Sequence, residues 1–317
     1  MNILILGYGV EGKSVENYFK HDPAIYEHTK IDILDNFKKE ELLFKDFSDY
    51  DLIFRTPSIP PKFIEAPKEK VTSVTKFFFH HCPCPIIGVT GTKGKGTTCT
   101  MTRDLLKNIT DKNIYLVGNI GTAALDVLPD LTENDVVVYE MSSFQLWDMD
   151  ISPAVSVVLR LEPDHLDVHE SFAEYLAAKQ NIVNFQTADD FCVYFKDNED
   201  TVSLASHSKA QKLEYPYSEP KLLYELQVPG AHNREDAEAA LLAALAYFKK
   251  YQGYAKSFDD FLKDYDEPLR KALHDFKALP HHIELVRELS GVKYYDDSFS
   301  TVSPALRACL NAFPDTP

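Results

Sequence analysis

The segment Gly-Thr-Lys-Gly-Lys-Gly-Thr-Thr, residues 91–98, holds residue types that together bind a triphosphate. An apolar run, Ile86–Thr90, precedes it and a helical pattern from Thr97 to Lys107 follows, so the order is strand, glycine loop, helix. The backbone N–H groups of such a loop surround phosphates, a lysine neutralises charge, and a hydroxyl binds Mg²⁺. The loop is not a strict Walker A motif, because Val89 stands where that pattern has its first glycine. The pattern favours a triphosphate site over a glycine-rich turn with incidental lysines.

A second glycine motif, Gly-Tyr-Gly-Val-Glu-Gly at residues 7–12, follows the apolar strand Ile3–Leu6. Its glycines permit a tight turn, and the helix after them attracts a pyrophosphate, which predicts a nucleotide-type ligand. The motif alone does not decide between NAD and another nucleotide. Glu27, at the end of an expected second strand Ala24–Tyr26, is equally compatible with a ribose contact and with an ordinary exposed charge.

Further polar residues follow strands of the expected central sheet. Glu140 ends the run that begins at Val136, and Asp164-His165 comes after the run Val155–Leu159. Ligand sites of parallel sheets form at the carboxyl ends of the strands, and a carboxylate facing a triphosphate is a natural magnesium ligand. We therefore expect these side chains on the same sheet edge as the glycine loop.

The elements around these motifs predict an α/β chain with more than one domain. Continuous apolar runs fit parallel strands, and we expect a further strand at Leu52–Phe54 and helices at Phe172–Val183 and Ala237–Tyr251. The proline-rich run 80–85 is predicted to be a linker. We expect a Rossmann-like domain at 1–81, a central P-loop ATPase-type domain at 82–280, and a linker plus the start of a third domain at 281–317. In that third part we expect a strand at Gly291–Asp297 and a helix at Pro304–Phe313. The 27 residues from Gly291 on are too few for a self-standing domain, so we expect a truncated Rossmann-like C-terminal domain.

Composition limits the function classes. The 317 residues carry a net charge of −16, which argues against nucleic-acid binding but not against a small phosphate ligand. No run of eighteen apolar residues or signal-peptide pattern occurs, so no membrane association is expected. The five cysteines lack metal or redox spacing, and we expect reduced thiols in a cytoplasmic protein.

The order of motifs along the chain resembles that of the Mur ligases. The segments that carry the resemblance, besides the two glycine motifs, are Gly118-Asn119-Ile120-Gly121, Glu140-Met141-Ser142-Ser143-Phe144-Gln145-Leu146, Asp164-His165-Leu166-Asp167, Lys179, Gly230-Ala231-His232-Asn233, Leu279-Pro280-His281 and Asp297-Ser298. The segment after Glu140 is most similar to the branch of the family that joins D-glutamate to UDP-N-acetylmuramoyl-L-alanine. The resemblance implies a cytoplasmic enzyme of peptidoglycan synthesis, expected as a monomer, that forms an acyl phosphate with ATP before the amine attacks.

By the same resemblance, Lys95, His165 and Lys179 are the catalytic residues, and Lys179 is carbamylated so that it becomes an anionic oxygen ligand. Two Mg²⁺ ions are implied, with ligands from Thr97, Glu140, His165 and Lys179. The residues implied in ATP binding are Gly91, Thr92, Lys93, Gly94, Lys95, Gly96, Thr97, Thr98, Asn233, His282 and Asp297. The residues implied in binding the UDP substrate are Gly9, Val10, Glu11, Gly12, Ser58, Asn119, Ser142 and Ser143.

The chain departs from the family pattern at several positions. Gly96 replaces the hydroxyl residue after the loop lysine, so the magnesium hydroxyl is assigned to Thr97 instead. His282 and Phe299 stand where the family has an arginine and a lysine, and Arg160 stands where it has an asparagine. Three alternatives stay open: a folylpolyglutamate-type or other Mur-type ligase, a binding-only fragment without turnover, and an NAD dehydrogenase. We expect residues 1–317 to bind the UDP substrate and to be inactive alone.

Overall fold

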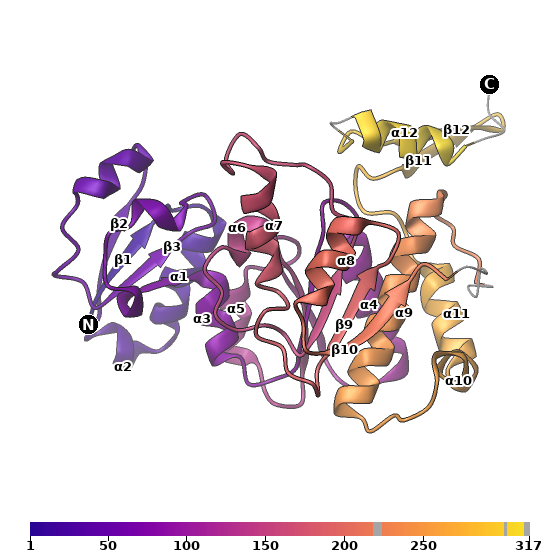
Figure 1. Ribbon diagram of the computed structural model, residues 1–317, viewed down its shortest axis with the longest axis horizontal. Helices are drawn as coiled ribbons and strands as arrows, with labels where there is room; N and C mark the ends of the chain where they lie inside the picture. The colour runs from indigo at the N-terminus through magenta and orange to yellow at the C-terminus, as the bar shows by residue number, and fades with distance from the viewer. Residues whose placement is uncertain (218–223, 301–302, 314–317) are drawn as a thin grey trace.

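The computed structural model describes residues 1–217, 224–300 and 303–313, and it contains three separate sheets (Figure 1). The first two sheets are parallel and carry helices, as the alternation of strand and helix patterns predicts. We call the part around the first sheet the N-terminal unit (residues 1–81) and the part around the second the central unit (residues 82–280). The α/β fold class is confirmed.

The N-terminal unit has a four-stranded sheet in the order β2-β1-β3-β4. Its strands are β1 (Asn2–Leu6), β2 (Lys30–Leu34), β3 (Leu52–Arg55) and β4 (Val71–Ser73). Its helices are α1 (Val10–His21), α2 (Pro23–Tyr26) and α3 (Val74–His81), with 3₁₀ turns at Lys39–Phe44, Pro61–Phe63 and Lys68–Lys70. The order of the strands reverses between β1 and β3. Ligand crevices of such sheets form at this switch point, and the glycine motif directly follows β1 there.

The predicted second strand, Ala24–Tyr26, is wrong, because these residues form helix α2. Asp22 caps that helix by accepting a hydrogen bond from Ala24 N at 2.9 Å, and Pro23 occupies its first turn, where proline is favoured. The true second strand, β2, lies at the sheet edge and is only partly buried, so it lacks a continuous apolar run. Glu27 therefore follows a helix, and the acid after the second strand is Asp35.

The central unit has a six-stranded parallel sheet in the order β10-β9-β8-β5-β7-β6. Its strands are β5 (Ile86–Thr90), β6 (Ile114–Gly118), β7 (Val136–Glu140), β8 (Val155–Val158), β9 (Phe191–Phe195) and β10 (Gln211–Tyr215). Its helices are α4 (Lys95–Ile109), α5 (Ala124–Val127), α6 (Ser143–Leu146), α7 (Phe172–Gln180), α8 (Glu199–Ser206), α9 (Ala231–Tyr251), α10 (Phe258–Asp264) and α11 (Asp266–Asp275), with a 3₁₀ turn at Leu128–Asp130. Strand order reverses at β5, so the predicted triphosphate loop lies at the switch point of the sheet.

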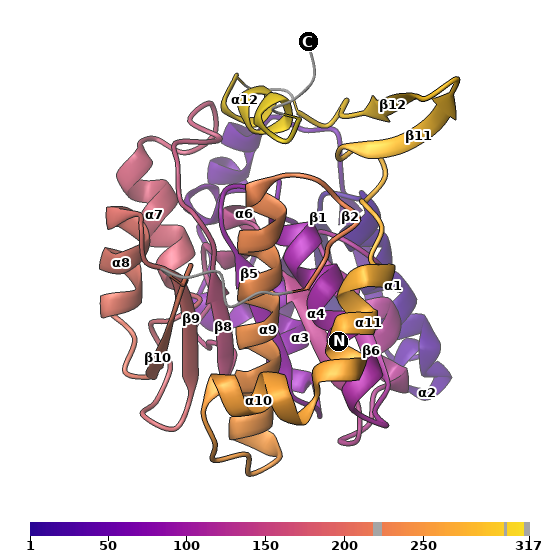
Figure 2. The same ribbon diagram turned by 90° about the vertical axis from the view of Figure 1, so that its right-hand side faces the viewer.

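Helices cover both faces of this central sheet. Helix α4 contacts both α9 and α11 over one face, where α9 runs the height of the sheet (Figure 2). On the other face, apolar side chains of α3 and α5 share one cluster with those of the sheet, and α5 also contacts α1 of the N-terminal unit. A single apolar cluster joins Ile3 and Phe54 of the N-terminal unit to Val137 and Tyr139 of the central sheet. The two units therefore share one core across their junction.

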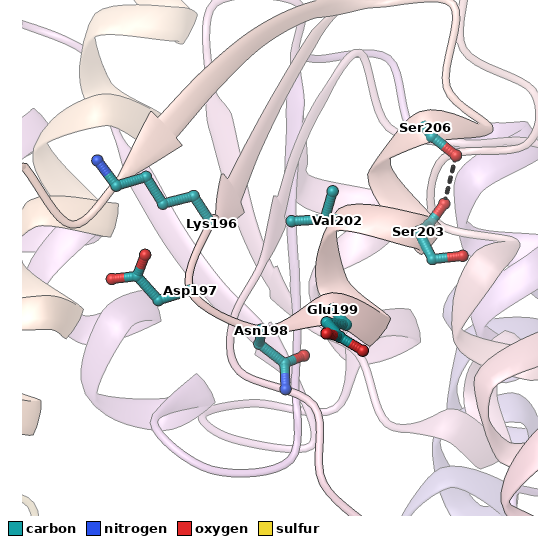
Figure 3. Close-up of a pocket in the computed structure, with 7 residues that line it drawn as sticks. All are labelled: Lys196, Asp197, Asn198, Glu199, Val202, Ser203 and Ser206. Carbon is teal, nitrogen blue, oxygen red and sulfur yellow. Dashed lines mark hydrogen bonds between the residues drawn. The ribbon is translucent and has the colours of Figure 1, made fainter.

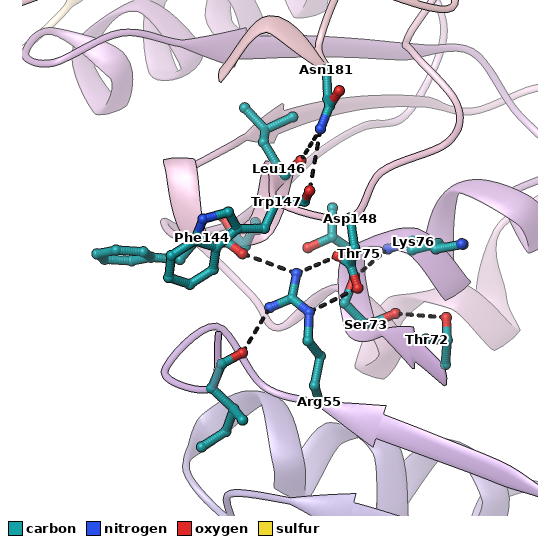
Figure 4. Close-up of polar contacts among 12 residues, drawn as sticks. Arg55, Thr72, Ser73, Thr75, Lys76, Phe144, Leu146, Trp147, Asp148 and Asn181 are labelled. Carbon is teal, nitrogen blue, oxygen red and sulfur yellow. Dashed lines mark hydrogen bonds and ion pairs between the residues drawn. The ribbon is translucent and has the colours of Figure 1, made fainter. Parts of the chain in front are cut away.

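A buried arginine crosses this junction. Arg55, at the end of β3, has no exposed surface and donates from Nε to Asp148 Oδ2 at 2.8 Å (Figure 4). Its guanidinium also forms an ion pair with Asp148 Oδ1 and donates to Phe144 O at 3.1 Å. A planar guanidinium with several donors suits such a site, because it satisfies a carboxylate and a carbonyl together.

The remaining segment forms a two-stranded sheet and a helix. Strands β11 (Glu284–Leu289) and β12 (Val292–Asp296) pair antiparallel, and α12 (Ser303–Asn311) follows. The predicted strand Gly291–Asp297 exists as β12, but its partner strand β11 was not predicted. None of the helices in the described ranges is long and apolar enough to cross a membrane.

Candidate functional site

The glycine loop after β5 sits at the start of helix α4, as predicted. Gly94 is the N-cap of α4 and has a φ of 82°, a left-handed conformation that favours glycine. A Cβ on Gly94 would lie 2.3 Å from Asp236 Oδ1, so the carboxyl group of α9 rests directly on the loop. The exposed N–H groups at the helix start and the close approach of α9 shape a phosphate cradle.

Two lysines converge on one carbonyl of this loop. Lys95 Nζ donates to Gly91 O at 3.1 Å and to Thr92 O at 3.0 Å. Lys179 Nζ, from α7, donates to Gly91 O at 3.0 Å and to Thr90 Oγ1 at 3.1 Å. The Lys179 side chain is 2 % exposed, although a lysine on an amphipathic helix is ordinarily at the surface.

The pKa values of both lysines are lowered, chiefly because burial disfavours the charged ammonium. The positive charge of Lys95 lowers the pKa of Lys179 further. The partly buried amine of Lys95 and the buried amine of Lys179 lie beside the N–H groups at the start of α4, and an anionic ligand placed there would favour the charged form of both. The geometry therefore supports phosphate binding at this loop.

A buried carboxylate faces the same loop. Glu140, at the end of β7, is 5 % exposed, and its Oε1 accepts a hydrogen bond from Asn119 Nδ2 at 3.1 Å. A Cβ on Gly96 would lie 3.4 Å from Glu140 Oε2, so residue 96 is directed toward this acid. The same Cβ would lie 3.0 Å from Leu279 Cδ1 and 3.2 Å from Ile120 Cδ1. The position that carries a hydroxyl in the family thus points at the acid, but here apolar side chains occupy the space around it.

The Asp164-His165 pair lies beside the loop, with the acid nearer to it. Asp164 Oδ2 is 3.7 Å from Lys93 Nζ, and the Asp164 charge raises the pKa values of Lys95 and Lys179 against the effect of burial. His165 has a φ of 53°, an uncommon conformation for a residue other than glycine, and its ring contacts Phe144 at 4.9 Å between centroids. Such backbone strain clusters at functional sites. The pair is therefore positioned at the sheet edge that the sequence predicted.

Sequence reasoning missed two residues of this site. Tyr175, one helical turn before Lys179, shares a hydrogen bond with Thr92 Oγ1 at 2.9 Å, and its ring lies 4.8 Å from Lys179 Nζ. Asp236 lies in the first turns of α9, which begins at Ala231 rather than at the predicted Ala237. Burial raises the pKa of Asp236 well above its ordinary value, and the charge of Glu235 adds to this effect. The four-residue spacing from Lys179 is the one sequence signal that could have indicated Tyr175.

The first glycine motif borders a separate hollow of about 320 Å³. Its lining residues are Gly7, Tyr8, Gly9, Val10, Glu11, Asp35, Thr56, Pro57 and Ser58. It thus brings together four of the predicted substrate-binding residues, Gly9, Val10, Glu11 and Ser58. Gly12 does not line it, because a Cβ there would lie 2.2 Å from Gly7 O, which shows that this glycine serves the tight turn.

Glu11 links this hollow to the central unit. Its Oε1 accepts a hydrogen bond from Gln145 Nε2 at 2.7 Å, whereas its Oε2 is buried without a hydrogen-bond partner among the described residues. Burial raises the pKa of Glu11 to about 7. Gln145 in turn accepts from Ser142 N at 2.9 Å, in the capping box of α6. Ser143 is buried and its hydroxyl lies 2.9 Å from His169 Nε2.

The predicted residues around the adenosine lie near the start of α9 and in the segment before β11. Asn233 is buried and donates to Pro229 O at 2.6 Å. Asp297 accepts from Ile283 N at 3.1 Å, and its charge raises the pKa of His232 on α9 against the larger lowering by burial. The ring of His282 stacks on Phe299 at 4.2 Å. Two residues that depart from the family pattern thus contact each other.

A larger hollow, of about 590 Å³, lies at the end of β9 and the start of α8 (Figure 3). None of the predicted site residues lines it. Its polar side chains serve local structure: Asn198 caps α8 by accepting from Thr201 N at 2.9 Å, and Ser206 Oγ donates to Ser203 O at 2.6 Å. The size of this hollow alone does not make it the functional site.

Comparison with known proteins agrees with the motif order. Residues 89–238 match the family model of the Mur ligase middle domain. A UDP-N-acetylmuramoylalanine--D-glutamate ligase of Clostridium kluyveri is 37% identical over 86% of this chain, which spans 61% of that relative. The enzyme of the same name from Acetivibrio thermocellus is 31% identical over 99% of this chain, and 72% of that relative is covered.

Solved structures show the same fold at low sequence identity. MurF of Acinetobacter baumannii matches with a TM-score of 0.58 and 16% identity, covering 77% of this chain and 57% of MurF. MurF of Thermotoga maritima, solved in complex with ADP, matches with a TM-score of 0.54 and 16% identity, covering 84% of this chain and 66% of that protein.

Proposed function

The chain belongs to the Mur ligase family, and on that premise we propose that it serves the ATP-dependent ligation of D-glutamate to UDP-N-acetylmuramoyl-L-alanine. The names of the relatives at 37% and 31% identity support this substrate pair. The observation that carries the proposal is the convergence of Lys95 and Lys179 on Gly91 O, beside the buried Glu140. The reaction belongs to the cytoplasmic stage of peptidoglycan synthesis.

The two glycine motifs take different ligands in this proposal. The loop after β5 has the amine of Lys95 to neutralise phosphate charge, so it takes ATP. The hollow beside β1 offers backbone N–H groups and the hydroxyl of Ser58, so it takes the uridine diphosphate part of the substrate. In this proposal Asn119, which donates to Glu140, contacts the muramoyl-alanine part of the substrate.

In the reaction, the substrate carboxylate attacks the γ-phosphorus of ATP and ADP leaves. The amine of D-glutamate then attacks the acyl phosphate, and inorganic phosphate leaves as the amide forms. Lys95 exchanges the carbonyls of Gly91 and Thr92 for phosphate oxygens, which stabilises charge as it develops. Mg²⁺, when bound, neutralises phosphate charge, and the carboxylate of Glu140, the imidazole of His165 and an oxygen-bearing Lys179 are suitable ligands for it.

The surroundings of Lys179 favour its proposed carbamylation. Only an uncharged amine can attack CO₂, and burial lowers the pKa of Lys179 well below its ordinary value. The product, an N-carboxylated lysine, carries one negative charge shared by two oxygens in place of an ammonium. Lys95 and the start of α4 supply positive charge that would stabilise this anion.

Phosphate release from ATP by a form that spans the full length of these relatives tests the function, since residues 1–317 are expected to be inactive alone. It should require both UDP-N-acetylmuramoyl-L-alanine and D-glutamate, and Lys95→Met should abolish it. Because the chain spans 61% of the Clostridium kluyveri relative, calorimetric binding of ATP with Mg²⁺ and of the UDP substrate is measured separately from turnover. Release with a folate substrate and glutamate, but not with this pair, would contradict the proposal. Binding of the UDP substrate without any Mg²⁺-dependent ATP binding would indicate a binding module only.

Carbamylation is tested by ¹³C NMR after equilibration with ¹³C-bicarbonate. We expect one carbamate resonance that disappears in Lys179→Arg and persists in the matched variant Lys93→Arg. A spectrum unchanged by Lys179→Arg would exclude the modification while leaving the ligase proposal intact.

A further inference from the structure

Two cysteines lie at the covalent junction between the N-terminal and central units. Cys82 is the C-cap of α3, where its N–H donates to Phe78 O at 2.8 Å. Pro85 alone separates Cys84 from the first residue of β5. This junction is at the amino end of β5, whereas the glycine loop is at its carboxyl end. The cysteines are therefore separate from the proposed ligase site.

Their sulfur atoms are in direct contact. Cys82 Sγ lies 3.6 Å from Cys84 Sγ and also 3.6 Å from Cys84 O. A disulfide bond is about 2.05 Å long, so its formation would bring the two sulfurs about 1.5 Å closer than they lie in this contact. Pro83 alone separates the two cysteines along the chain, and its ring fixes its own φ.

The two thiols differ in exposure and in acidity. Cys82 is partly exposed, whereas Cys84 is 7 % exposed within the apolar cluster at the junction. A hydrogen bond from the Cys84 thiol lowers the pKa of Cys82, and the same bond together with burial raises the pKa of Cys84. An accessible, more acidic thiol beside a buried one is the arrangement of an attacking and a resolving cysteine.

The surroundings do not supply the further ligands of a metal site. Across the described ranges, the group of three or more potential ligands that lies close enough for one ion is His281, Glu284 and Asp296, far along the chain. The nearby histidines have other contacts, since His80 pairs with Asp150 at 2.8 Å and His81 stacks on Phe77. Two sulfurs alone fall short of the four ligands of a structural zinc site.

We propose that Cys82 and Cys84 form a redox-active dithiol that reduces small-molecule disulfides. The Cys82 thiolate attacks one sulfur of the disulfide, forms a mixed disulfide and releases the first thiol. Cys84 then loses its proton, attacks Cys82 Sγ and releases the second thiol. The balance is one protein dithiol and one small disulfide giving one protein disulfide and two small thiols.

The test uses oxidised glutathione as the disulfide. The reduced chain is incubated with it, quenched in acid and analysed by mass spectrometry of the whole chain and of the peptide that contains residues 82–84. We expect this peptide to lose two hydrogen atoms and to hold no lasting glutathione. A stable glutathione adduct on Cys82 without an internal disulfide would overturn the proposal, as would unreacted Cys82 and Cys84 under conditions that modify Cys309.

Single variants separate the two roles. Cys84→Ser should trap glutathione on Cys82. In Cys82→Ser, glutathione should modify Cys84 at least about tenfold more slowly than it modifies Cys82 in Cys84→Ser, because the accessible thiolate is gone. Cys309→Ser, which removes another partly exposed thiol, should leave the reaction unchanged. Circular dichroism of each variant checks that it is folded. Equal adduct formation on Cys82 and Cys84 in the two single variants would contradict the assigned order.

Discussion

The two glycine motifs of this chain use the same backbone device with opposite surroundings. In each, a strand ends in a glycine turn and a helix begins, so N–H groups face a ligand. The loop after β5 adds the amines of Lys95 and Lys179. The hollow beside β1 adds acids instead, since Glu11 and Asp35 line it.

This difference shows that the side chains, more than the turn, decide which phosphate ligand fits. A transferred phosphoryl group develops charge that must be neutralised, which requires cations close by. A diphosphate that is only held in place needs orientation, which N–H groups and hydroxyls provide. Glu11 has a further task, because it ties its loop to Gln145 of the central unit.

The largest expected effect concerns the junction that holds the first loop in place. Arg55→Ala should lower the free energy of unfolding by about 3–5 kcal/mol, because it leaves Asp148 and the Phe144 carbonyl without their buried partner. Urea unfolding measures this. The matched control is Lys62→Ala, which breaks an exposed ion pair to Glu170 across the same junction and should change the free energy of unfolding far less, because water screens the pair. Equal losses would mean that Arg55 does not join the two units.

Glu11→Gln tests the acid in the first loop. The folded state holds the Glu11 proton up to a pKa of about 7, against 4.5 for an unperturbed glutamate, so stability falls as pH rises from about 4.5 to 7. A glutamine at position 11 removes this pH-dependent loss of stability, and its side-chain oxygen can still accept the hydrogen bond from Gln145 Nε2. The variant should equal the natural chain near pH 4 and exceed it by up to about 3 kcal/mol at pH 8. Thermal unfolding across this range measures the difference, and a difference that does not change with pH would contradict the buried carboxyl.

Lys95→Met tests the cations of the second loop. Hydrogen bonds to charged groups contribute about 1.5–3 kcal/mol, so ATP affinity should fall about 10- to 100-fold while affinity for the UDP substrate stays the same. Lys93→Met, in the same loop but with a side chain that is 48% exposed, should have a smaller effect. Calorimetry with each ligand measures both. Loss of UDP-substrate binding in Lys95→Met would mean that the two loops do not bind separate ligands.

The smallest effects distinguish the glycines themselves. Gly94→Ala should destabilise the chain by about 1–3 kcal/mol, because of its left-handed backbone and the contact with Asp236. Gly9→Ala should change stability by at most about 0.5 kcal/mol, since its Cβ would meet no atom within 4 Å. Chemical denaturation compares the two. A larger loss for Gly9 would show that the first loop is the more tightly constrained.

The parts of the fold that the sequence predicted are those with continuous apolar runs. Strands β1, β5, β7 and β8 are buried along their length apart from the first residue of β1, and their patterns indicated them directly. Strand β2 was missed because an edge strand alternates with polar residues, and β11 because its residues are mostly exposed. Strand β9 is an interior and mostly buried strand that was missed as well, so burial on both faces favours detection without ensuring it.

The same limit applies to the site. The order of glycines and lysine predicted the loop, and the family resemblance alone identified Lys179. The contact of Asp236 with Gly94 depends on how α9 crosses α4, which no local pattern encodes. The link between Glu11 and Gln145 joins residues 134 positions apart and depends on the placement of two units.

The approach of Leu279 to Gly96 has a consequence for how such sequences can diverge. A serine at position 96 would bring its Cβ to 3.0 Å from Leu279 Cδ1, so the hydroxyl could return only if the leucine moved aside or became smaller. Because Leu279 belongs to the Leu-Pro-His segment that this chain shares with family members that carry the hydroxyl, a lineage with serine at 96 should keep the leucine but hold it in a different rotamer.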